Sequence, residues 1–204
     1  MNKLNLDDLP FLKDYRKLKS WLSIRLTNSN HLKPDTIFKP FLDLSITCHI
    51  DIGDVVASVA SCTVNSGLLE YIGVEKERLF SDALENSIKT RPPVTMPIET
   101  CLTHLGFPGV EEGTHLMVAT TEGLAYGAAV VLYPAFLERV SCGRSLFFIP
   151  SSVHEWIYLE DDGTLDEQEL TDLLQTVNRE IVAEEEILSD HLYCWRDGRF
   201  GKAE

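Results

Sequence analysis

Three long stretches of the chain, 14–28, 74–91 and 166–181, carry apolar residues at the spacing of an amphipathic helix. The adjacent prolines 92 and 93 predict the end of the second stretch. The third has the clearest start, because Asp166 has an acidic residue three positions further on, the spacing of a capping box. This helix should pack one apolar side on a sheet and leave an acidic side in water. The predicted apolar stripe is Leu170, Leu173, Leu174, Val177 and Ile181.

Shorter helices are predicted from their end signals. Asn65 can cap a helix over 66–72 that ends at Gly73. A second short helix over 97–105 would have its cap at Thr95 or Met96. A third would begin near Pro134 and end at Gly143, with Phe136, Leu137 and Val140 as its apolar stripe.

Strict alternation of apolar and polar residues over 41–52 predicts a strand with one wet face. Gly53 and Asp54 would then turn the chain into a partner strand over 55–64, which makes a hairpin. A second pair of strands is predicted over 115–133, around Glu122 and Gly123. Short strands are also expected over 146–149, 153–160 and 190–195, with the first two separated by a turn at 150–152.

Hairpins that alternate with short helices favour an α+β fold over a doubly wound α/β one. The predicted sheets are mixed or antiparallel and built from hairpins, with short helices packed on them. Residues 1–13 should be loosely ordered, 14–91 should form an N-terminal lobe, and 94–204 a C-terminal lobe. A single continuous domain is the alternative.

The composition is that of an ordinary soluble protein, with 44% hydrophobic and 25% charged residues. No apolar run has the length of a membrane span, and acidic residues interrupt the N-terminal stretch where a signal peptide needs apolar ones. We therefore expect a cytoplasmic protein. The five cysteines are scattered without CxxC spacing, which favours reduced thiols over a metal or redox site.

The net charge of −14 is unevenly distributed, with −3 in residues 1–150 and −11 in residues 151–204. A surface this acidic repels phosphate backbones and anionic membranes, so neither nucleic acid nor membrane is an expected partner. Solubility is the simplest reason for the charge. A basic protein that binds the acidic final third is the partner the charge allows, and the sequence does not indicate an oligomeric state.

The motifs of common active sites are absent from the sequence or fail on geometry. GxGxxG, GxxxxGK[ST] and GxSxG do not occur. His154 and Glu155 begin like HExxH, but the fifth position is Tyr158 and the segment is predicted to be a strand. Ser189, Asp190 and His191 are adjacent, and adjacent residues on a strand point to opposite faces, which argues against a catalytic triad.

Two weaker candidates lie elsewhere. Ser151 and Ser152 precede His154 and raise the possibility of a serine nucleophile, but a Pro-Ser-Ser sequence is typical of a turn. Asp43, His49 and Asp51 share the polar face of the strand over 41–52 and could hold a cation, although polar strand faces are routine.

The main candidate site depends on two strands being neighbours. If 153–159 and 190–195 pair in one sheet, two histidines lie amid aromatic side chains, and Glu155 or Asp190 could help them hold a metal or small ligand. Alternatively, the aromatic face is the floor of a core with both histidines hydrogen-bonded, which we favour. The residues of this face are His154, Trp156 and Tyr158 with His191, Tyr193 and Trp195.

The segments LFFIPSSVHEWIYLEDDG (146–163) and ELTDLLQTVNREIVAEEEILSDHLYCW (169–195) resemble the C-terminal signature of domain-of-unknown-function family 5688. FKPFLDLSIT, GVEKERLFSDALENS and GLAYGAAVVLYPAFLE are also similar to their counterparts there, so the resemblance runs from about Tyr15 onward. Its most specific parts are 150–155, 177–178 and 188–191. The residues that match the motif are Ser152, His154, Glu155, Asn178, Ser189, Asp190 and His191.

The resemblance implies a bacterial protein of the Firmicutes in a cytoplasmic setting, without an assigned activity. Members often carry a further N-terminal segment that this sequence lacks. An activity that needs this segment would be missing or supplied by another chain.

We therefore expect a non-catalytic binding or regulatory module without a cofactor, and we assign no catalytic residue. The alternative is a metal-dependent or hydrolytic enzyme that uses His154, Glu155, Asp190 and His191. A third possibility is a structural or immunity-type partner of a toxin. The candidate ligand-binding residues are Ser152, His154, Glu155, Trp156, Asn178, Asp190, His191 and Tyr193.

Overall fold

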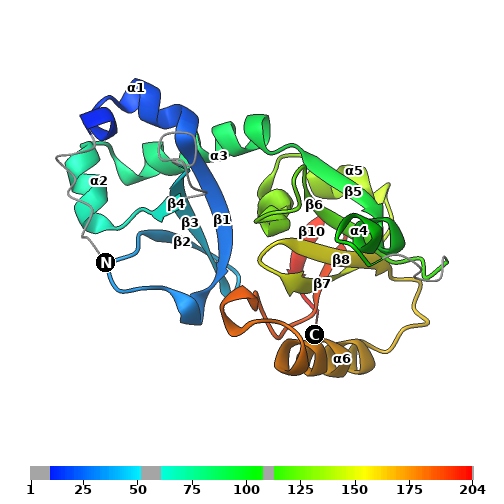
Figure 1. The fold of residues 1–204 in the computed structure, drawn as a ribbon. Helices are drawn as coiled ribbons and strands as arrows, with labels where there is room; N and C mark the ends of the chain where they lie inside the picture. The colour runs from blue at the N-terminus through cyan, green and yellow to red at the C-terminus, as the bar shows by residue number, and fades with distance from the viewer. Residues whose placement is uncertain (1–9, 52–60, 108–112, 204) are drawn as a thin grey trace.

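A computed structural model describes residues 10–51, 61–107 and 113–203 of the chain. They form an α+β fold with two antiparallel sheets, which confirms the predicted fold class. The two sheets lie side by side, with the N-terminal elements at one end of the molecule and the C-terminal ones at the other (Figure 1).

The first sheet has β3 (Leu44–Asp51) in the middle. β1 (Leu22–Asn28) pairs with one edge of β3, and β2 (Phe38–Phe41) and β4 (Ser61–Thr63) pair with the other. The pairing of β3 with β4 confirms the predicted hairpin partner, while the turn at Gly53 and Asp54 lies outside the described residues.

The predicted helix over 14–28 is wrong in its second half. The chain is helical only in α1 (Tyr15–Leu18) and the 3₁₀ turn η3 (Lys19–Trp21), and it then enters β1. Leu22 and Leu26 fit a helical face, but they also fit the period of two in Leu22, Ile24 and Leu26, all of which are buried. Pairing along the whole length of β3 decides in favour of the strand.

The polar face of β3 is buried, contrary to the prediction of a wet face. Ser45, Thr47 and His49 are each less than a tenth exposed. Their side chains hydrogen-bond one another and neighbouring strands, as in the contact of 3.1 Å between the hydroxyls of Thr27 and Thr47. The alternation of polar and apolar residues therefore predicts the strand correctly, but it does not predict that the polar face is exposed to solvent.

Helices α2 (Ser66–Ile72) and α3 (Lys76–Thr90) follow as predicted. Asn65 caps α2 by accepting a hydrogen bond from the backbone N–H of Leu68, and Gly73 ends it at φ +73°. α3 ends just before Pro92 and packs against β1. Other short segments before β2 are the 3₁₀ turns η2 (Pro10–Lys13) and η4 (Ser29–His31).

The second sheet follows Pro92 and has the strand order β10-β9-β7-β8-β6-β5. Its strands are β5 (Pro93–Pro97), β6 (Met117–Thr121), β7 (Leu146–Ser152), β8 (Glu155–Glu160), β9 (Tyr193–Arg196) and β10 (Arg199–Lys202). Helices α4 (Ile98–His104), α5 (Phe136–Ser141) and α6 (Glu167–Glu180) and the 3₁₀ turn η6 (Glu184–Glu186) connect them.

Four details of the prediction for this half are wrong. The strand expected over 190–195 is β9 and begins at Tyr193, so Ser189, Asp190 and His191 precede the strand instead of alternating along it. The second strand expected within 115–133 is the 3₁₀ helix η5 (Gly127–Leu132), because a short apolar run fits a buried helix as well as a strand. Pro97 is the cap of α4, and Thr95 lies within β5. The turn between β7 and β8 falls at Val153 and His154 instead of 150–152.

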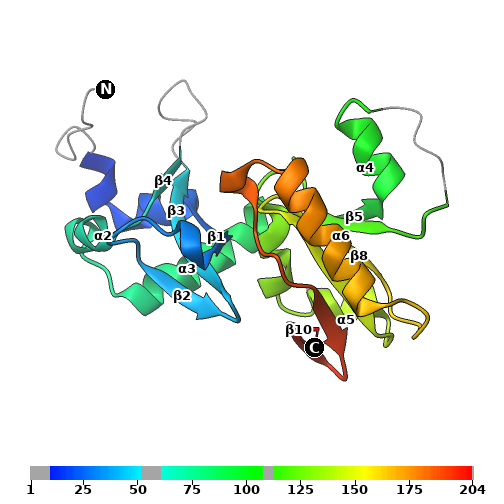
Figure 2. The ribbon, with the colours of Figure 1, turned by 90° about the horizontal axis from the view of Figure 1, so that it is seen from below.

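Helix α6 begins as predicted, because the Asp166 carboxylate accepts hydrogen bonds from the backbone N–H groups of Gln168 and Glu169. Its apolar stripe is only partly covered by the sheet. Leu174 is buried, but Leu173 is 57% exposed and Ile181, just past the helix end, is 78% exposed. Figure 2 shows α6 lying across one side of the second sheet.

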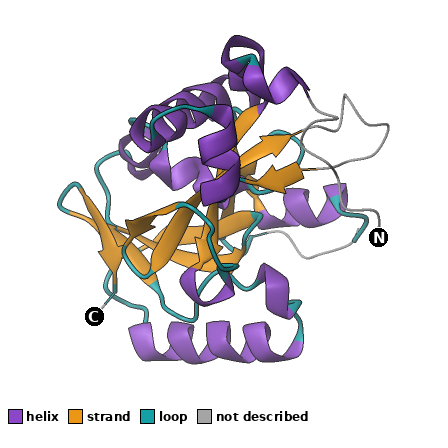
Figure 3. Ribbon diagram, turned by 90° about the vertical axis from the view of Figure 1, so that its left-hand side faces the viewer, coloured by secondary structure: helices purple, strands orange, loops and turns teal. Residues whose placement is uncertain are grey.

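The second sheet has helices on both sides (Figure 3). On the side of α6, Phe147, Leu192 and Cys194 form a small cluster. The other side carries Phe148, Trp156 and Tyr193, which belong to one large core. That core also contains Ile24, Leu26 and other residues of the first sheet, so one continuous apolar cluster joins both sheets.

Within the described ranges, no helix is both long enough and apolar enough to cross a membrane.

Candidate functional site

The family-motif residues Ser152, His154 and Glu155, at the turn between β7 and β8, are held together by local hydrogen bonds. The Ser152 hydroxyl accepts from the backbone N–H of His154 at 3.0 Å and donates to Glu155 Oε1 at 2.8 Å. The carbonyl of His154 accepts from Thr120 Oγ1 and from the Gly127 N–H, both at 2.8 Å. These bonds fix the turn and attach η5 to it.

The His154 imidazole lies between the start of η5 and η6. Its Nδ1 accepts a hydrogen bond of 3.0 Å from the backbone N–H of Tyr126, so the ring proton is on Nε2, which lies 3.4 Å from Glu186 Oε1. The Tyr126 ring contacts the imidazole at a centroid distance of 5.1 Å. The buried Arg25 guanidinium of β1 stacks over the Tyr126 ring at 3.5 Å, which extends the contact to the first sheet.

The family-motif residues Asn178, Ser189 and Asp190 attach the end of α6 to the segment that leads into β9. Asn178 is buried, and its Nδ2 donates to the carbonyl of Ser189 at 3.0 Å and to Asp190 Oδ1 at 2.8 Å. Gln175 Nε2 donates to the carbonyl of Asp190 at 3.3 Å. Asn178 and Asp190 therefore stabilise the connection from α6 to β9.

Asp43 meets this motif from the other sheet, across about 150 positions of sequence. It lies in the two-residue turn between β2 and β3, beside Leu42 at φ +56°. Its Oδ2 is 3.1 Å from Ser189 Oγ and 2.9 Å from His191 Nδ1, and its Oδ1 accepts from Tyr193 Oη at 2.7 Å. Three side chains of the second half thus bind one carboxylate of the first.

Burial of Asp43 opposes ionisation of its carboxyl, but the hydrogen bonds from Tyr193 and Ser189 and the nearby His191 lower its pKa below the usual value. The ionised carboxylate requires a donor at His191 Nδ1. The lone pair of a neutral imidazole is therefore on Nε2. Burial raises the pKa of Tyr193, which keeps the phenol protonated as a donor to Asp43.

The strands of the predicted site are not neighbours. β8 and β9 both pair with β7, which lies between them. Trp156 and Tyr193 still meet on one face, with ring centroids 5.1 Å apart, and both are fully buried. His154 and His191 bind different partners, as described above. The aromatic face is therefore part of the core, and the two histidines belong to two separate hydrogen-bonded clusters.

The candidate cation site on β3 is also dispersed. Asp43 binds the second sheet, whereas Asp51 binds Arg25 at 3.0 Å and Arg91 at 2.7 Å. Burial, with a contribution from the two arginines, lowers the pKa of His49 to about 3. In the ranges 10–51, 61–107 and 113–203, no group of three or more His, Cys, Asp or Glu side chains is placed to hold a metal ion.

A small polar pocket of about 210 Å³ lies beside His191. Its lining includes Gln168, Thr171, Gln175 and Asp190. The Asp43 carboxylate orients the imidazole as a carboxylate orients a catalytic histidine. Ser189, however, lies on the Nδ1 side, at 3.3 Å, so the basic Nε2 does not activate it. Proton transfer to or from a molecule in the pocket is the chemistry that this arrangement allows.

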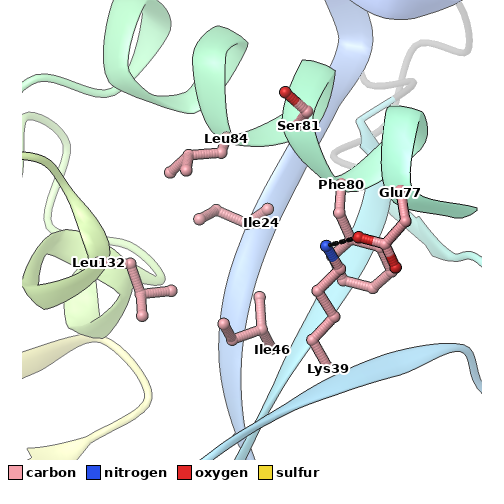
Figure 4. A pocket seen from close by; sticks show the side chains of 8 residues that line it. All are labelled: Ile24, Lys39, Ile46, Glu77, Phe80, Ser81, Leu84 and Leu132. Atoms are coloured by element: carbon pink, nitrogen blue, oxygen red, sulfur yellow. Dashed lines mark hydrogen bonds and ion pairs between the residues drawn. The ribbon is translucent and has the colours of Figure 1, made fainter.

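A larger and mainly apolar pocket of about 390 Å³ lies between the first sheet, α3 and η5. Leu84 of α3, Ile24 of β1, Ile46 of β3 and Leu132 of η5 approach one another there, and Lys39 pairs with Glu77 beside the Phe80 ring (Figure 4). Ser81 completes the lining. The walls thus come from five separate elements of both halves.

The sequence patterns did not indicate this pocket. Residues 14–28 are predicted to be a helix and Leu132 is predicted to lie in a strand, so the patterns do not bring Ile24 and Leu132 to a shared cavity. Tyr126 and Glu186 are not among the predicted site residues, and the pairing of Asp43 with Ser189, His191 and Tyr193 is not predicted, because contacts between distant parts of the chain leave no local pattern. The alternation of polar residues in β3 is the local pattern that could indicate such contacts.

The fold and the site define an α+β protein with a continuous core across two antiparallel sheets and an apolar pocket between the first sheet, α3 and η5. The chain belongs to the family described as a family of unknown function, DUF5688, whose profile matches residues 1–197. No curated protein and no solved structure shows significant similarity to the chain.

Proposed function

We propose that this protein is a non-catalytic binding or regulatory module that holds a small apolar molecule in the pocket between α3, the first sheet and η5. The pocket itself is the observation that carries the proposal. Its volume of about 390 Å³ lies within the range of small-molecule sites, and apolar walls with a few polar groups at the rim are typical of them. Its position between two packed halves is also typical.

The motif residues support a role without catalysis. The polar atoms of Ser152, Glu155 and Asn178 bind neighbouring turns and helices, and the Ser189 hydroxyl binds Asp43. The contacts of Ser152, Glu155 and Asn178 fix local turns within the C-terminal half, and the contact of Ser189 with Asp43 joins this half to the first sheet, which forms most of the pocket wall. A binding protein needs this kind of rigid support around its site.

The test is a fluorescence titration with N-phenyl-1-naphthylamine, a neutral probe that brightens in apolar surroundings. The wild-type protein should bind it saturably with one site per chain. Leu84→Trp fills the pocket and should weaken binding at least about tenfold, a loss of about 1.4 kcal/mol. Leu173→Trp is the matched control, because Leu173 is an exposed helical leucine far from the pocket lining, and it should bind as the wild type does.

Circular dichroism of both variants shows whether each retains the fold. A folded Leu84→Trp variant that binds the probe as tightly as the wild type would place the probe elsewhere and contradict the proposal. Absence of saturable binding to the wild type would contradict it as well.

Hydrolysis is the second candidate function, and the Asp43–His191 pair beside the small polar pocket favours it. It ranks second because the lining of the pocket includes the carboxylates of Glu167 and Asp190, and their negative charge opposes the formation of an oxyanion. Hydrolysis of 4-nitrophenyl acetate tests it. We expect equal rates for the wild type and His191→Ala, and a rate lost in the variant would favour the hydrolase.

A further inference from the structure

The mouth of the apolar pocket carries more positive than negative charge at close range. Lys39 Nζ lies 5.1 Å from the centroid of the Phe80 ring, which lines the pocket. Lys76 Nζ lies 6.0 Å from the same ring and 6.0 Å from that of Phe38. Two ammonium groups therefore surround Phe80, and the Glu77 carboxylate pairs with Lys39.

The Glu77 carboxylate is an exchangeable partner for Lys39. Its side chain is 78% exposed, whereas that of Lys39 is 33% exposed. An exposed ion pair contributes little net stability, so another carboxylate can replace Glu77 at small cost. The Phe80 ring attracts the ammonium independently, which keeps Lys39 at the pocket when Glu77 leaves.

The interior of the pocket accepts an apolar body. Ile24, Ile46, Leu84 and Leu132 provide aliphatic walls, and Ile24 is almost fully buried. Burial of aliphatic or aromatic carbon there is favourable in proportion to the area removed from water. A charged group placed among these side chains would lose its hydration without a partner, so the charge of a ligand must remain at the mouth.

We propose that the pocket binds a small amphipathic anion, a monocarboxylate with an aliphatic or aromatic body, and that its head group replaces Glu77 at Lys39. The body lies between α3 and η5, and the carboxylate binds the ammonium over the Phe80 ring. This inference rests on the proposed function and adds the chemical class of the ligand and the residue that selects it.

The test compares three probes with equal chains and different heads, octanoate, 1-octanol and octylamine, as competitors of N-phenyl-1-naphthylamine at neutral pH. Octanoate should compete about 5- to 10-fold better than 1-octanol, the effect of one partly exposed charge-assisted hydrogen bond. Octylamine should be the weakest, because Lys39 and Lys76 repel it.

Variants at the mouth separate the roles of the two charges. Lys39→Gln should reduce the affinity for octanoate to that for 1-octanol and leave 1-octanol unchanged. Glu77→Gln removes the competing carboxylate and should increase the affinity for octanoate. The increase should be only about 3-fold, because an exposed ion pair is weak. Lys202→Gln, on β10, is the matched lysine control and should change nothing.

The outcomes distinguish this inference from the function on which it rests. If the neutral probe binds in the pocket but octanoate and 1-octanol compete equally, or octylamine competes best, the anion inference is wrong and the binding function stands. If Lys39→Gln keeps the preference for octanoate, Lys39 is not the selecting residue and the inference is wrong. If the neutral probe does not bind the pocket, the proposed function itself fails.

Discussion

Asp43 lies in a turn of the first sheet, yet its carboxylate binds three side chains of the other half of the chain. Ser189, His191 and Tyr193 all converge on its two oxygens, and each of them belongs to the other half of the chain. The positive φ of Leu42 beside it is unfavourable for a residue with a Cβ and persists only where surrounding contacts hold it. The hydrogen bonds of Asp43 provide those contacts.

The Asp43→Asn substitution should destabilise the protein by about 2–3 kcal/mol. The amide retains one acceptor oxygen and replaces the other with an NH₂ group, which faces donors at Ser189 and His191 or at Tyr193. Urea unfolding followed by circular dichroism measures the change. Glu184→Gln, an exposed carboxylate in η6, is the control and should change stability by less than about 0.5 kcal/mol. A similarly small effect for Asp43→Asn would show that the cluster contributes little.

His49 makes the stability depend on pH. Its ring is buried between Thr47 and Thr63, and burial, followed by the charges of Arg25 and Arg91, lowers its pKa from 6.5 to about 3. In that interval the unfolded chain binds a proton that the folded chain does not. Stability should therefore fall as the pH falls below 6.5, by up to about 1.4 kcal/mol per pH unit from this residue.

The His49→Gln variant should have a flatter dependence of unfolding free energy on pH over roughly pH 7 to 5, where histidines dominate the titration. Urea unfolding at several pH values measures the slope. His104→Gln, on the exposed face of α4, should leave the wild-type slope unchanged. Equal slopes for wild type and His49→Gln would mean that the folded protein accepts the proton at His49.

Among the elements, η5 depends on a close approach that only glycine permits. A Cβ at Gly127 would lie 2.3 Å from Thr120 Oγ1, 2.6 Å from the His154 carbonyl oxygen and 2.6 Å from the Thr121 nitrogen. Two of these atoms are backbone and cannot move aside. Gly127→Ala should therefore separate η5 from the turn between β7 and β8 and destabilise the protein by more than about 2 kcal/mol.

Gly201→Ala is the matched control for this prediction, because a Cβ at Gly201 meets no atom within 4 Å. It should change stability by no more than about 0.5 kcal/mol in thermal unfolding. A Gly127→Ala variant as stable as Gly201→Ala would mean that η5 can shift without cost. It would also predict an altered pocket, since Leu132 lies at the end of the same element.

The elements that were predicted correctly are those with signals in their own sequence. α2 has Asn65 and Gly73, and α6 has Asp166, so local hydrogen bonds decide where they begin or end. β1 and η5 were wrong because their apolar spacing fits two structures, and partners far along the chain decide between them. Leu173 belongs to the apolar stripe predicted to pack on the sheet, but it is 57% exposed.

For the whole molecule, the sequence predicts mixed or antiparallel sheets with short helices packed on them, and it does not predict how the sheets join. The aromatic face was expected as a core floor, which the buried Trp156 and Tyr193 form. Its cover comes from η5 and the first sheet, and the Asp43 cluster joins residues up to 150 positions apart in the chain. Such contacts depend on how the elements are arranged in the fold, which local sequence patterns do not show. The sequence does not predict the pocket between α3, the first sheet and η5 for the same reason.

The continuous core predicts that both halves unfold together. Ile24 of the first sheet and Trp156 of the second belong to one apolar cluster, and Asp43 and Arg25 add polar contacts between the halves. Native-state hydrogen exchange should therefore give the most protected amides of β3 and β7 the same opening free energy, within about 1 kcal/mol. The Asp43→Asn variant should lower both values equally. If β3 instead opens at least about 2 kcal/mol more easily than β7, the N-terminal half is an independent folding unit. Ligand binding at the junction would then stabilise both halves by bringing them together.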